Sequence, residues 1–195
     1  MGVYDVAIRR RSIRRFKQKK IDLKILKKLV NAARLAPSAA NIQPLEFILL
    51  NNKELCDKIF NTIGWAGYLK PSWKPNDDQR PTAYIIIISE ESLSKWYIRD
   101  ASLAAGNICL CAEEENIGSC ILAKIKKSDI KKILDIPNNY IIDTVVALGY
   151  KDEQPVIEKY EGSIKYWMDE KKILHVPKKN LDDITHIDGF KIKKR

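Results

Sequence analysis

One amphipathic helix with a polar motif at each end is the feature that most limits what this chain can fold into. Apolar residues recur with helical spacing over 23–36. Asp22 is a good N-cap for this helix, and Pro37 ends it. The chain reads Arg-Arg-Arg-Ser-Ile-Arg-Arg-Phe over 9–16 and Pro-Ser-Ala-Ala-Asn-Ile-Gln-Pro over 37–44. One rigid helix therefore separates two motifs that are rich in hydrogen-bonding groups.

The arginine-rich motif before the helix has the chemistry of an anion site. A phosphate group needs positive charge and fork-shaped donors, and Arg10, Arg11 and Arg14 supply both at close quarters. Ser12 adds a short hydroxyl donor. The alternative is a basic first helix that lies on the protein surface, which is common.

The motif after the helix has the composition of a polar recognition loop. Ser38, Asn41 and Gln43 offer hydrogen-bonding groups, and the flanking Pro37 and Pro44 stiffen the backbone. An ordinary helix-to-strand connection would contain similar turn residues. Together, the two motifs predict a ligand with a phosphate at one end and hydrogen-bonding heteroatoms at the other. Flavin mononucleotide (FMN) fits that description.

Length and composition predict one globular domain of 195 residues, large enough to bury a core. The net charge of +10 is compatible with nucleic-acid binding, but the lysines are spread over every segment and no nucleic-acid motif is present. Solvated helix faces explain this charge better, so no nucleic-acid partner is expected. The longest apolar run, 83–88, is too short to span a membrane, and the N-terminus lacks an apolar signal segment. We therefore expect a cytoplasmic protein without a membrane partner.

Several common chemistries have no motif in this chain. The glycines do not fall in the spacing of a Rossmann dinucleotide site or a Walker P-loop, and no G-x-S-x-G elbow is present. The two histidines do not stand in metal-ligand spacing, so no metal site is expected. Cys109 and Cys111 point to nearly opposite sides of a predicted helix, and we interpret them as small core thiols.

After the second motif, helices and strands are mixed. Short apolar segments predict strands at 45–50, 84–88, 120–122 and 141–150. Helical patterns predict helices at 53–62, at 96–116, and from an N-cap at Ser128 to about 134. In the helix at 96–116, Ile98 is expected on the apolar face with Ala101, Ala105, Ile108 and Ala112, and the charged end at 113–115 is expected in solvent.

The last 45 residues, 151–195, are charged and have too few grouped apolar residues for a core of their own. They read either as a disordered tail or as a C-terminal extension that packs onto something, such as a partner subunit. Tyr160, Tyr166, Trp167 and Phe190 favour packing. The end at 191–195 is predicted to be a solvated basic segment.

The order of the motifs resembles the nitroreductase family over nearly the whole chain. The two most specific matches are Arg-Arg-Ser-Ile-Arg-Arg-Phe and Ala-Pro-Ser-Ala-Ala-Asn-Ile-Gln-Pro-Leu-Glu-Phe, with a helix between them. Weaker matches follow in order at 100–110, 117–121, 136–137, 145–150 and 177–184. The resemblance implies an α+β fold with a central, mostly antiparallel sheet flanked by helices. It also implies an intertwined homodimer, with FMN at the interface and a C-terminal arm that wraps the partner.

The resemblance also assigns roles to residues. Arg10, Ser12 and the pair Lys178 and Lys179 would hold the phosphate, and Arg14 would approach the N1/O2 edge of the flavin ring. Residues 37–41 would come from the partner chain, and 121–123 would lie along the ring. The predicted cofactor-binding residues are Arg10, Arg11, Ser12, Arg14, Pro37, Ser38, Ala39, Asn41, Gln43, Ile121, Leu122, Ala123, Lys178 and Lys179.

The implied activity is an FMN-dependent oxidoreductase that uses NAD(P)H to reduce nitro compounds, quinones or related small molecules by a ping-pong mechanism. FMN carries the chemistry, so no side chain is predicted to be catalytic. A loop rich in Trp, Pro and Gly at 64–81 carries Trp65, Tyr68 and Trp73, which either cover the substrate or fill the dimer core. Two alternatives stay open: another flavin reaction on the same fold, namely dehalogenation, ene reduction or flavin breakdown, or a non-catalytic basic module that binds anions or nucleic acid.

Overall fold

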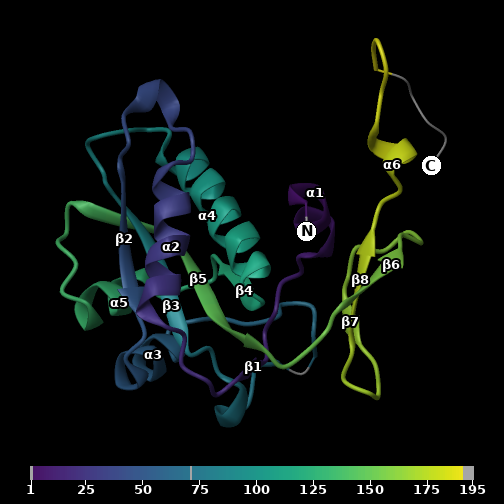
Figure 1. The fold of residues 1–195 in the computed structure, drawn as a ribbon, viewed down its shortest axis with the longest axis horizontal. Coiled ribbons are helices and arrows are strands. Elements are labelled where there is room, and N and C mark those ends of the chain that lie inside the picture. The colour runs from purple at the N-terminus through teal and green to yellow at the C-terminus, as the bar shows by residue number, and fades with distance from the viewer. Residues whose placement is uncertain (1, 71, 191–195) are drawn as a thin grey trace. The chain divides into compact units, whose positions relative to one another are not determined.

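The computed structural model describes residues 2–70 and 72–190, which form two compact units (Figure 1). The larger unit consists of residues 1–65 and 74–153, and the smaller one of residues 66–73 and 154–195. Each unit contains its own sheet. Within the described ranges, no helix has the length and apolar character needed to cross a membrane.

The larger unit is built on a five-stranded antiparallel sheet. Its strands are β1 (Phe16–Lys17), β2 (Leu45–Leu50), β3 (Ala83–Glu90), β4 (Ile117–Leu122) and β5 (Tyr140–Lys151). β5 pairs with β3 along one edge and with both β4 and β1 along the other, and β2 pairs with β3. This topology confirms the predicted α+β class with a mostly antiparallel sheet.

The strand β3 lies inside the sheet because nearly all of its side chains are apolar. Tyr84, Ile85, Ile86 and Ile87 are fully buried. A strand that is apolar on both faces must be covered on both. Ile85 and Ile87 belong to a core that they share with the helices α2 (Leu23–Arg34) and α4 (Tyr97–Glu114).

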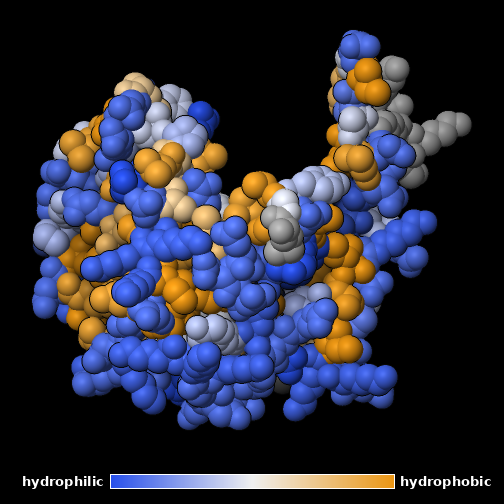
Figure 2. Space-filling view, viewed as in Figure 1, coloured by the Kyte–Doolittle hydropathy of each residue, from blue (hydrophilic) through white to orange (hydrophobic). Residues whose placement is uncertain are grey.

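The remaining helices of the larger unit are short. They are α1 (Val3–Arg9), α3 (Lys53–Phe60), α5 (Lys127–Ile133) and the 3-10 turns η1 (Ala39–Asn41) and η2 (Asp77–Gln79). α3 contacts β3 and α5, and α1 contacts α4. In the view of Figure 2, hydrophilic side chains cover the lower edge of this unit, and apolar side chains reach the surface higher up.

Most predicted elements of the larger unit are confirmed. The strand at 45–50 has the predicted bounds, and the other strands extend the predicted ones by a few residues. The amphipathic helix begins at Leu23 as predicted, and its N-cap Asp22 accepts a hydrogen bond from the backbone N–H of Lys24. It ends at Arg34, two residues before the predicted end at 36, and Leu35 is its C-cap.

Three details of the predictions were wrong. Glu113 is buried rather than solvated, because two cations pair with it. Ile98 is exposed, whereas the other residues of the predicted apolar face are buried. Ser128 lies inside α5, whose N-cap is Lys126, and its hydroxyl contacts Asp129 instead of capping the helix.

The smaller unit contains a three-stranded sheet made by the C-terminal segment. Its strands are β6 (Val156–Lys159), β7 (Trp167–Met168) and β8 (Leu174–Lys178), and the short helix α6 (Leu181–Ile184) follows. β8 is central, parallel to β6 and antiparallel to β7. The segment is therefore folded over its described part, although packing on a partner subunit stays a prediction. The predicted basic end at 191–195 lies outside the described residues.

Candidate functional site

The arginine-rich segment is not a helix but an extended strip that lies beside β4. The backbone N–H of Ile13 donates to the carbonyl of Ser119 (2.9 Å), and Ser12 forms a parallel bridge with Ser119. Gly118 permits this close approach, because a Cβ atom there would lie 2.8 Å from the Cβ of Ile13. The alternative of a basic surface helix is therefore excluded for residues 10–15, since α1 ends at Arg9.

One carboxylate from the end of β5 fixes the strip in place. The side chain of Glu153 is buried, and it accepts hydrogen bonds from the backbone N–H groups of Arg14 and Arg15. Its second oxygen lies 3.1 Å from Nε of Arg15. Arg15 is thus committed to the fold, and the backbone conformation at Arg14 is set by a residue 139 positions away.

Arg11 also has a structural partner. Its guanidinium donates to the carbonyl of Ile8 (2.6 Å) and to that of Arg10, which are carbonyls at the C-terminal end of α1. Burial and the nearby charge of Arg10 lower the pKa of Arg11. Arg11, one of the residues predicted for the phosphate end, therefore uses donors of its guanidinium to bind carbonyls at the end of α1.

The strip runs beside β4 next to Cys120, because Ser12 and Ile13 pair with the neighbouring Ser119. Burial raises the pKa of Cys120 to about 11, and the charges of Arg14 and Arg10 oppose that rise. Cys120 directly precedes the predicted ring-contacting segment 121–123, where Ile121 and Ala123 are exposed and Leu122 is buried. The structure thus brings two predicted parts of the site together: the half-buried Arg10, Ser12 and Arg14, and the end of β4.

The loop at 37–44 is held in an unusual backbone conformation. Ala40, Asn41 and Gln43 have φ angles of 50°, 55° and 52°, a left-handed region that non-glycine residues rarely occupy. The hydroxyl of Ser38 accepts a hydrogen bond from the backbone N–H of Gln43 (3.1 Å). Such strain persists only where surrounding contacts fix it, and it is frequent at ligand sites.

A small pocket opens beside this loop at the N-terminal end of α4. It has a volume of about 120 Å³, and its lining includes Ser38, Gln43, Arg34 and Asp100. Asp100 is buried, and its Oδ1 accepts a hydrogen bond from the backbone N–H of Ala39 (3.1 Å). The loop therefore has a hollow of mixed polar and apolar lining on one side, bounded by a buried carboxylate.

The two motifs contact opposite ends of α4. The segment at 37–44 reaches Asp100 in its first turn, and the arginine-rich segment follows Arg9, whose Nε lies 2.9 Å from Oε1 of Glu113 in the last turn. At a rise of about 1.5 Å per residue, Asp100 and Glu113 are about 20 Å apart along the axis. Figure 1 shows α1 and the connection between α2 and β2, which contains the loop at 37–44, on different sides of the larger unit. One chain thus keeps the two predicted halves of the site at different ends of the same helix.

The other predicted residues fall in both units. Trp65 is buried in the larger unit, where its ring packs 5.7 Å from that of Phe60. In the smaller unit, Tyr68 is exposed, and its ring meets that of Tyr166 edge-on at 5.0 Å. Trp73 is half-buried there. Lys178 ends β8, and Lys179 follows it with Nζ 6.0 Å from the ring centroid of Tyr160.

Sequence reasoning missed the carboxylates that position the two motifs. Glu153 and Glu113 come from distant segments, and nothing in their local sequence marks them as buried. Asp100 opens the Asp-Ala-Ser-Leu-Ala-Ala segment of the long helix, yet no role followed from that position. A polar residue at the start of an otherwise apolar helix is the signal that would have found it.

The fold and these motifs have close parallels among known proteins. The family model described as the Nitroreductase family matches residues 7–150. The chain belongs to the nitroreductase family. This match includes the arginine-rich segment, the loop at 37–44 and all but the last residue of the sheet of the larger unit, which agrees with the resemblance of the motifs.

Curated relatives cover most of the chain. The "Putative NADH dehydrogenase/NAD(P)H nitroreductase" of Archaeoglobus fulgidus is 34% identical over 158 residues, which are 76% of this chain and 86% of that protein. The iodotyrosine deiodinase of Thermotoga neapolitana is 25% identical over 182 residues, and the match covers 84% of this chain and 97% of that protein. The crystal structure of a nitroreductase family protein from Clostridium novyi is 27% identical, with a TM-score of 0.66 over 78% of this chain and 86% of that one.

Proposed function

We propose that this nitroreductase-family protein is an FMN-dependent oxidoreductase that takes electrons from NAD(P)H and passes them to a small-molecule acceptor such as a nitro compound or a quinone. The observation that carries the proposal is the fixed strip of Arg10, Ser12 and Arg14 beside the exposed end of β4. Relatives named NAD(P)H nitroreductases support the reaction class, and solved structures of this fold, an FMN-dependent nitroreductase and a nitroreductase with bound FMN, support the cofactor.

The residues present fit the phosphate end of FMN. Arg10 supplies a guanidinium and Ser12 a hydroxyl within one strip, which suits a phosphate dianion, and Arg14 supplies a second guanidinium further along the strip. Glu153 and Ser119 fix the backbone of the strip, so its donors are preorganised. When bound, FMN supplies the hydride and electron transfer. Arg14, placed at the ring edge, would favour the more negatively charged reduced form and raise the potential.

A site shared between two copies best unites the two motifs. Within one chain they contact opposite ends of α4, and a two-fold interface would let the loop of one copy meet the strip of the other. Exposed apolar side chains on the larger unit support such an interface; they are Val3, Tyr4 and Ile8 on α1, Leu35 and Ile42 near the loop, and Ile98 and Leu103 on α4. In the proposed homodimer, the C-terminal extension with Lys178 and Lys179 wraps the partner.

A second reaction has specific support. Iodotyrosine deiodinases appear among both the sequence relatives and the structures of this fold. Dehalogenation of a halophenol would use the same cofactor and site, with a different acceptor. Donor and acceptor would enter one pocket in turn in either case, which predicts ping-pong kinetics. Membership of the nitroreductase family gives no support to the alternative of a non-catalytic nucleic-acid module.

The test is the absorption spectrum of the purified protein together with identification of the released cofactor. We expect a yellow protein that releases FMN and is bleached by NADH or NADPH under anaerobic conditions. Arg10→Glu should weaken FMN binding by about 2–4 kcal/mol, because a charge-assisted bond becomes a repulsion. Lys20→Glu, the same charge change at an exposed residue, should bind FMN like the wild type. A colourless protein that FMN does not reconstitute contradicts the proposal.

A further inference from the structure

The buried carboxylate of Asp100 has one oxygen in use and one without a partner. Oδ1 accepts the backbone N–H of Ala39 at 3.1 Å, while Oδ2 is buried with no hydrogen-bond partner among the described residues. Asp100 is only 3% exposed and borders the pocket beside the loop at 37–44. A buried carboxylate that makes so few contacts is costly unless it has a task.

The position of Asp100 explains how the fold tolerates the charge. It lies in the first turn of α4, an 18-residue helix whose N-terminal dipole stabilises an anion. The helix α4 thus holds the carboxylate of Asp100 next to the loop at 37–44.

That loop needs an outside support. Three of its residues, Ala40, Asn41 and Gln43, are in the left-handed region, although none of them is glycine. Each such residue disfavours the conformation, so the loop would relax elsewhere unless contacts hold it. Within the loop, the N–H of Gln43 donates to Ser38 Oγ, and the N–H groups of Asn41 and Ile42 donate to carbonyls of the loop itself. The N–H of Ala39 instead donates to Asp100 Oδ1, outside the loop. Among the hydrogen bonds of the described residues, the one to Asp100 ties the loop to the core helix α4.

We propose that Asp100 is a positioning residue for cofactor binding: it holds the loop at 37–44 in its left-handed shape, so that Ser38, Ala39 and Asn41 are preorganised for the flavin. This inference rests on the proposed function, because it assumes that the loop contacts FMN. Preorganisation predicts that loss of the contact weakens binding without removing any group that touches the ligand.

Four variants test the inference. Asp100→Asn keeps an oxygen acceptor for the Ala39 amide, whereas Asp100→Ala removes it. Asp100→Ala combined with Ala40→Gly lowers the cost of the left-handed backbone at one loop residue. Asp57→Ala is the control, because it removes a carboxylate that pairs with Lys53 and Arg80 on α3 and the adjoining segment, outside the loop. The readouts are the FMN dissociation constant of the refolded apoprotein and the hydrogen-exchange rate of the Ala39 amide.

We expect Asp100→Ala to raise the FMN dissociation constant about tenfold and to speed exchange at Ala39, as the loss of a charge-assisted hydrogen bond predicts. Asp100→Asn should stay within about threefold of the wild type, and Ala40→Gly should recover about threefold in the Asp100→Ala background. Asp57→Ala should bind FMN like the wild type.

Equal FMN affinity in a folded Asp100→Ala protein and the wild type overturns this inference alone. The same holds if Asp100→Asn loses as much affinity as Asp100→Ala while its Ala39 amide stays protected, since the charge and not the loop shape would then matter. If Asp100→Ala does not fold, the Asn variant and its exchange rate decide. A wild-type protein that binds no FMN overturns the proposed function and this inference with it, whatever the exchange rates.

Discussion

Arg9 and Glu113 form an ion pair, with 2.9 Å between Nε and Oε1, that ties α1 to the last turn of α4. The carboxylate of Glu113 is 3% exposed, and its second oxygen lies 2.6 Å from Nζ of Lys151 in β5. Glu113 therefore joins α1 and β5 to α4 through two ion pairs. Because Arg9 directly precedes the arginine-rich strip, this pair also sets where the strip begins.

We predict that Glu113→Gln lowers the free energy of unfolding by about 2 kcal/mol, since it leaves two cations without their shared charge. The adjacent Glu114 is the matched control: it is 58% exposed and lies 3.6 Å from Lys28, so Glu114→Gln should change stability by less than about 0.5 kcal/mol. Urea unfolding of both variants measures the difference. Equal effects would mean that the pair with Arg9 contributes no more than a surface contact.

The fold was largely predictable because its elements carry strong local patterns. The spacing of Leu26, Leu29 and Ala33 predicted α2, and the apolar run at 83–88 predicted the buried strand β3. The solvent exposure of Glu113 was predicted incorrectly because its neighbours in sequence are charged. Its partners Arg9 and Lys151 come from segments that only the tertiary fold brings near, and no local pattern reports them.

The candidate site was predictable in its parts but not in its arrangement. The residue types at 9–16 and 37–44 indicated an anion and a polar ligand. The tie from Glu153 to the strip spans 139 residues, and the structural use of Arg11 depends on where α1 ends. Residue types indicate what kind of ligand a segment can bind. Contacts with residues distant in sequence determine how the segment is held and which of its donors bind the protein itself.

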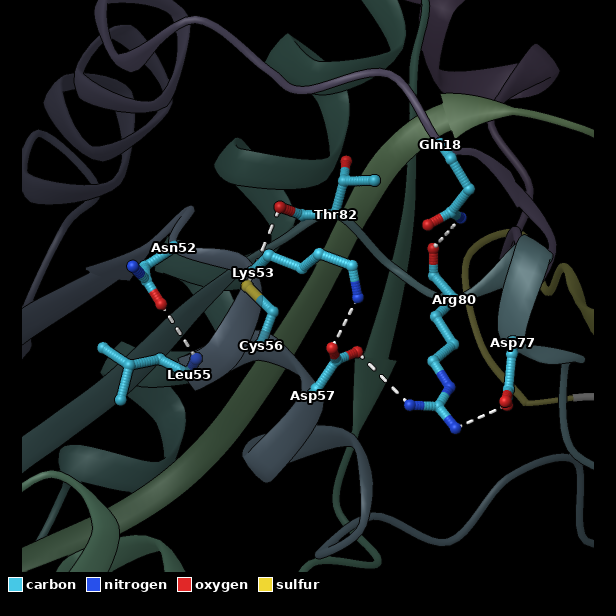
Figure 3. Close-up of polar contacts among 9 residues, drawn as sticks. All are labelled: Gln18, Asn52, Lys53, Leu55, Cys56, Asp57, Asp77, Arg80 and Thr82. Atoms are coloured by element: carbon cyan, nitrogen blue, oxygen red, sulfur yellow. Dashed lines mark hydrogen bonds and ion pairs between the residues drawn. The ribbon is translucent and has the colours of Figure 1, made fainter.

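A second stabilising cluster closes the larger unit where the chain returns to β3. The guanidinium of Arg80 lies between the carboxylates of Asp57 (3.2 Å) and Asp77 (2.5 Å), as Figure 3 shows. It also lies over the ring of Phe60, 4.5 Å from the centroid.

We predict that Arg80→Lys costs about 1–2 kcal/mol of stability, because lysine lacks the planar guanidinium that contacts both carboxylates at once. Lys53→Ala, which removes the 85% exposed partner of Asp57, should cost less than about 0.5 kcal/mol in the same thermal unfolding assay. Similar losses of stability in the two variants would contradict the role of the Arg80 guanidinium in joining the two carboxylates.

The smaller unit should depend on pH through His175. The ring nitrogens of His175 lie 2.7 Å from the carboxylate of Glu158 and 3.3 Å from that of Asp169, and hydrogen bonds donated to these carboxylates raise the pKa of His175 above its ordinary value of 6.5. Because the folded pKa is the higher one, the stabilisation is complete at low pH and is lost as the pH rises through that pKa. We expect backbone amides of β8 to exchange faster above it than the intrinsic pH effect explains. An NMR titration of the His175 ring should show a lower midpoint in Glu158→Gln than in the wild type. An unchanged midpoint would mean that Glu158 does not raise the pKa of His175.

Tyr68 should influence the choice of acceptor. Its ring is 45% exposed and rests edge-on against Tyr166, so it can face a ligand. We predict that Tyr68→Ala changes the ratio of kcat/KM values between a quinone and a nitroaromatic compound severalfold, with FMN content retained. Trp65→Ala is the contrast: that side chain is 8% exposed, and its loss should cost about 3 kcal/mol of stability. Failure of Tyr68→Ala to fold would instead assign this tyrosine to packing.

The central claim is that two copies of the chain build each flavin site. It rests on the contacts of the two motifs with opposite ends of α4, through Ala39 and Asp100 at one end and Arg9 and Glu113 at the other. One variant is damaged in the strip (Arg10→Glu with Ser12→Ala) and a second in the loop (Ser38→Ala with Asn41→Ala). Each homodimer should bind FMN poorly. In a mixed dimer, the two lesions coincide in one site and leave the other intact.

The decisive measurement is FMN bound per chain after an equal mixture of the two variants is unfolded and refolded together. About half of the dimers should be mixed, so about a quarter of all sites should regain FMN and its reduction by NAD(P)H. The two variants refolded separately provide the baseline. No recovery in a mixture that mass analysis shows to contain mixed dimers would mean that each site lies within a single chain, which contradicts the account.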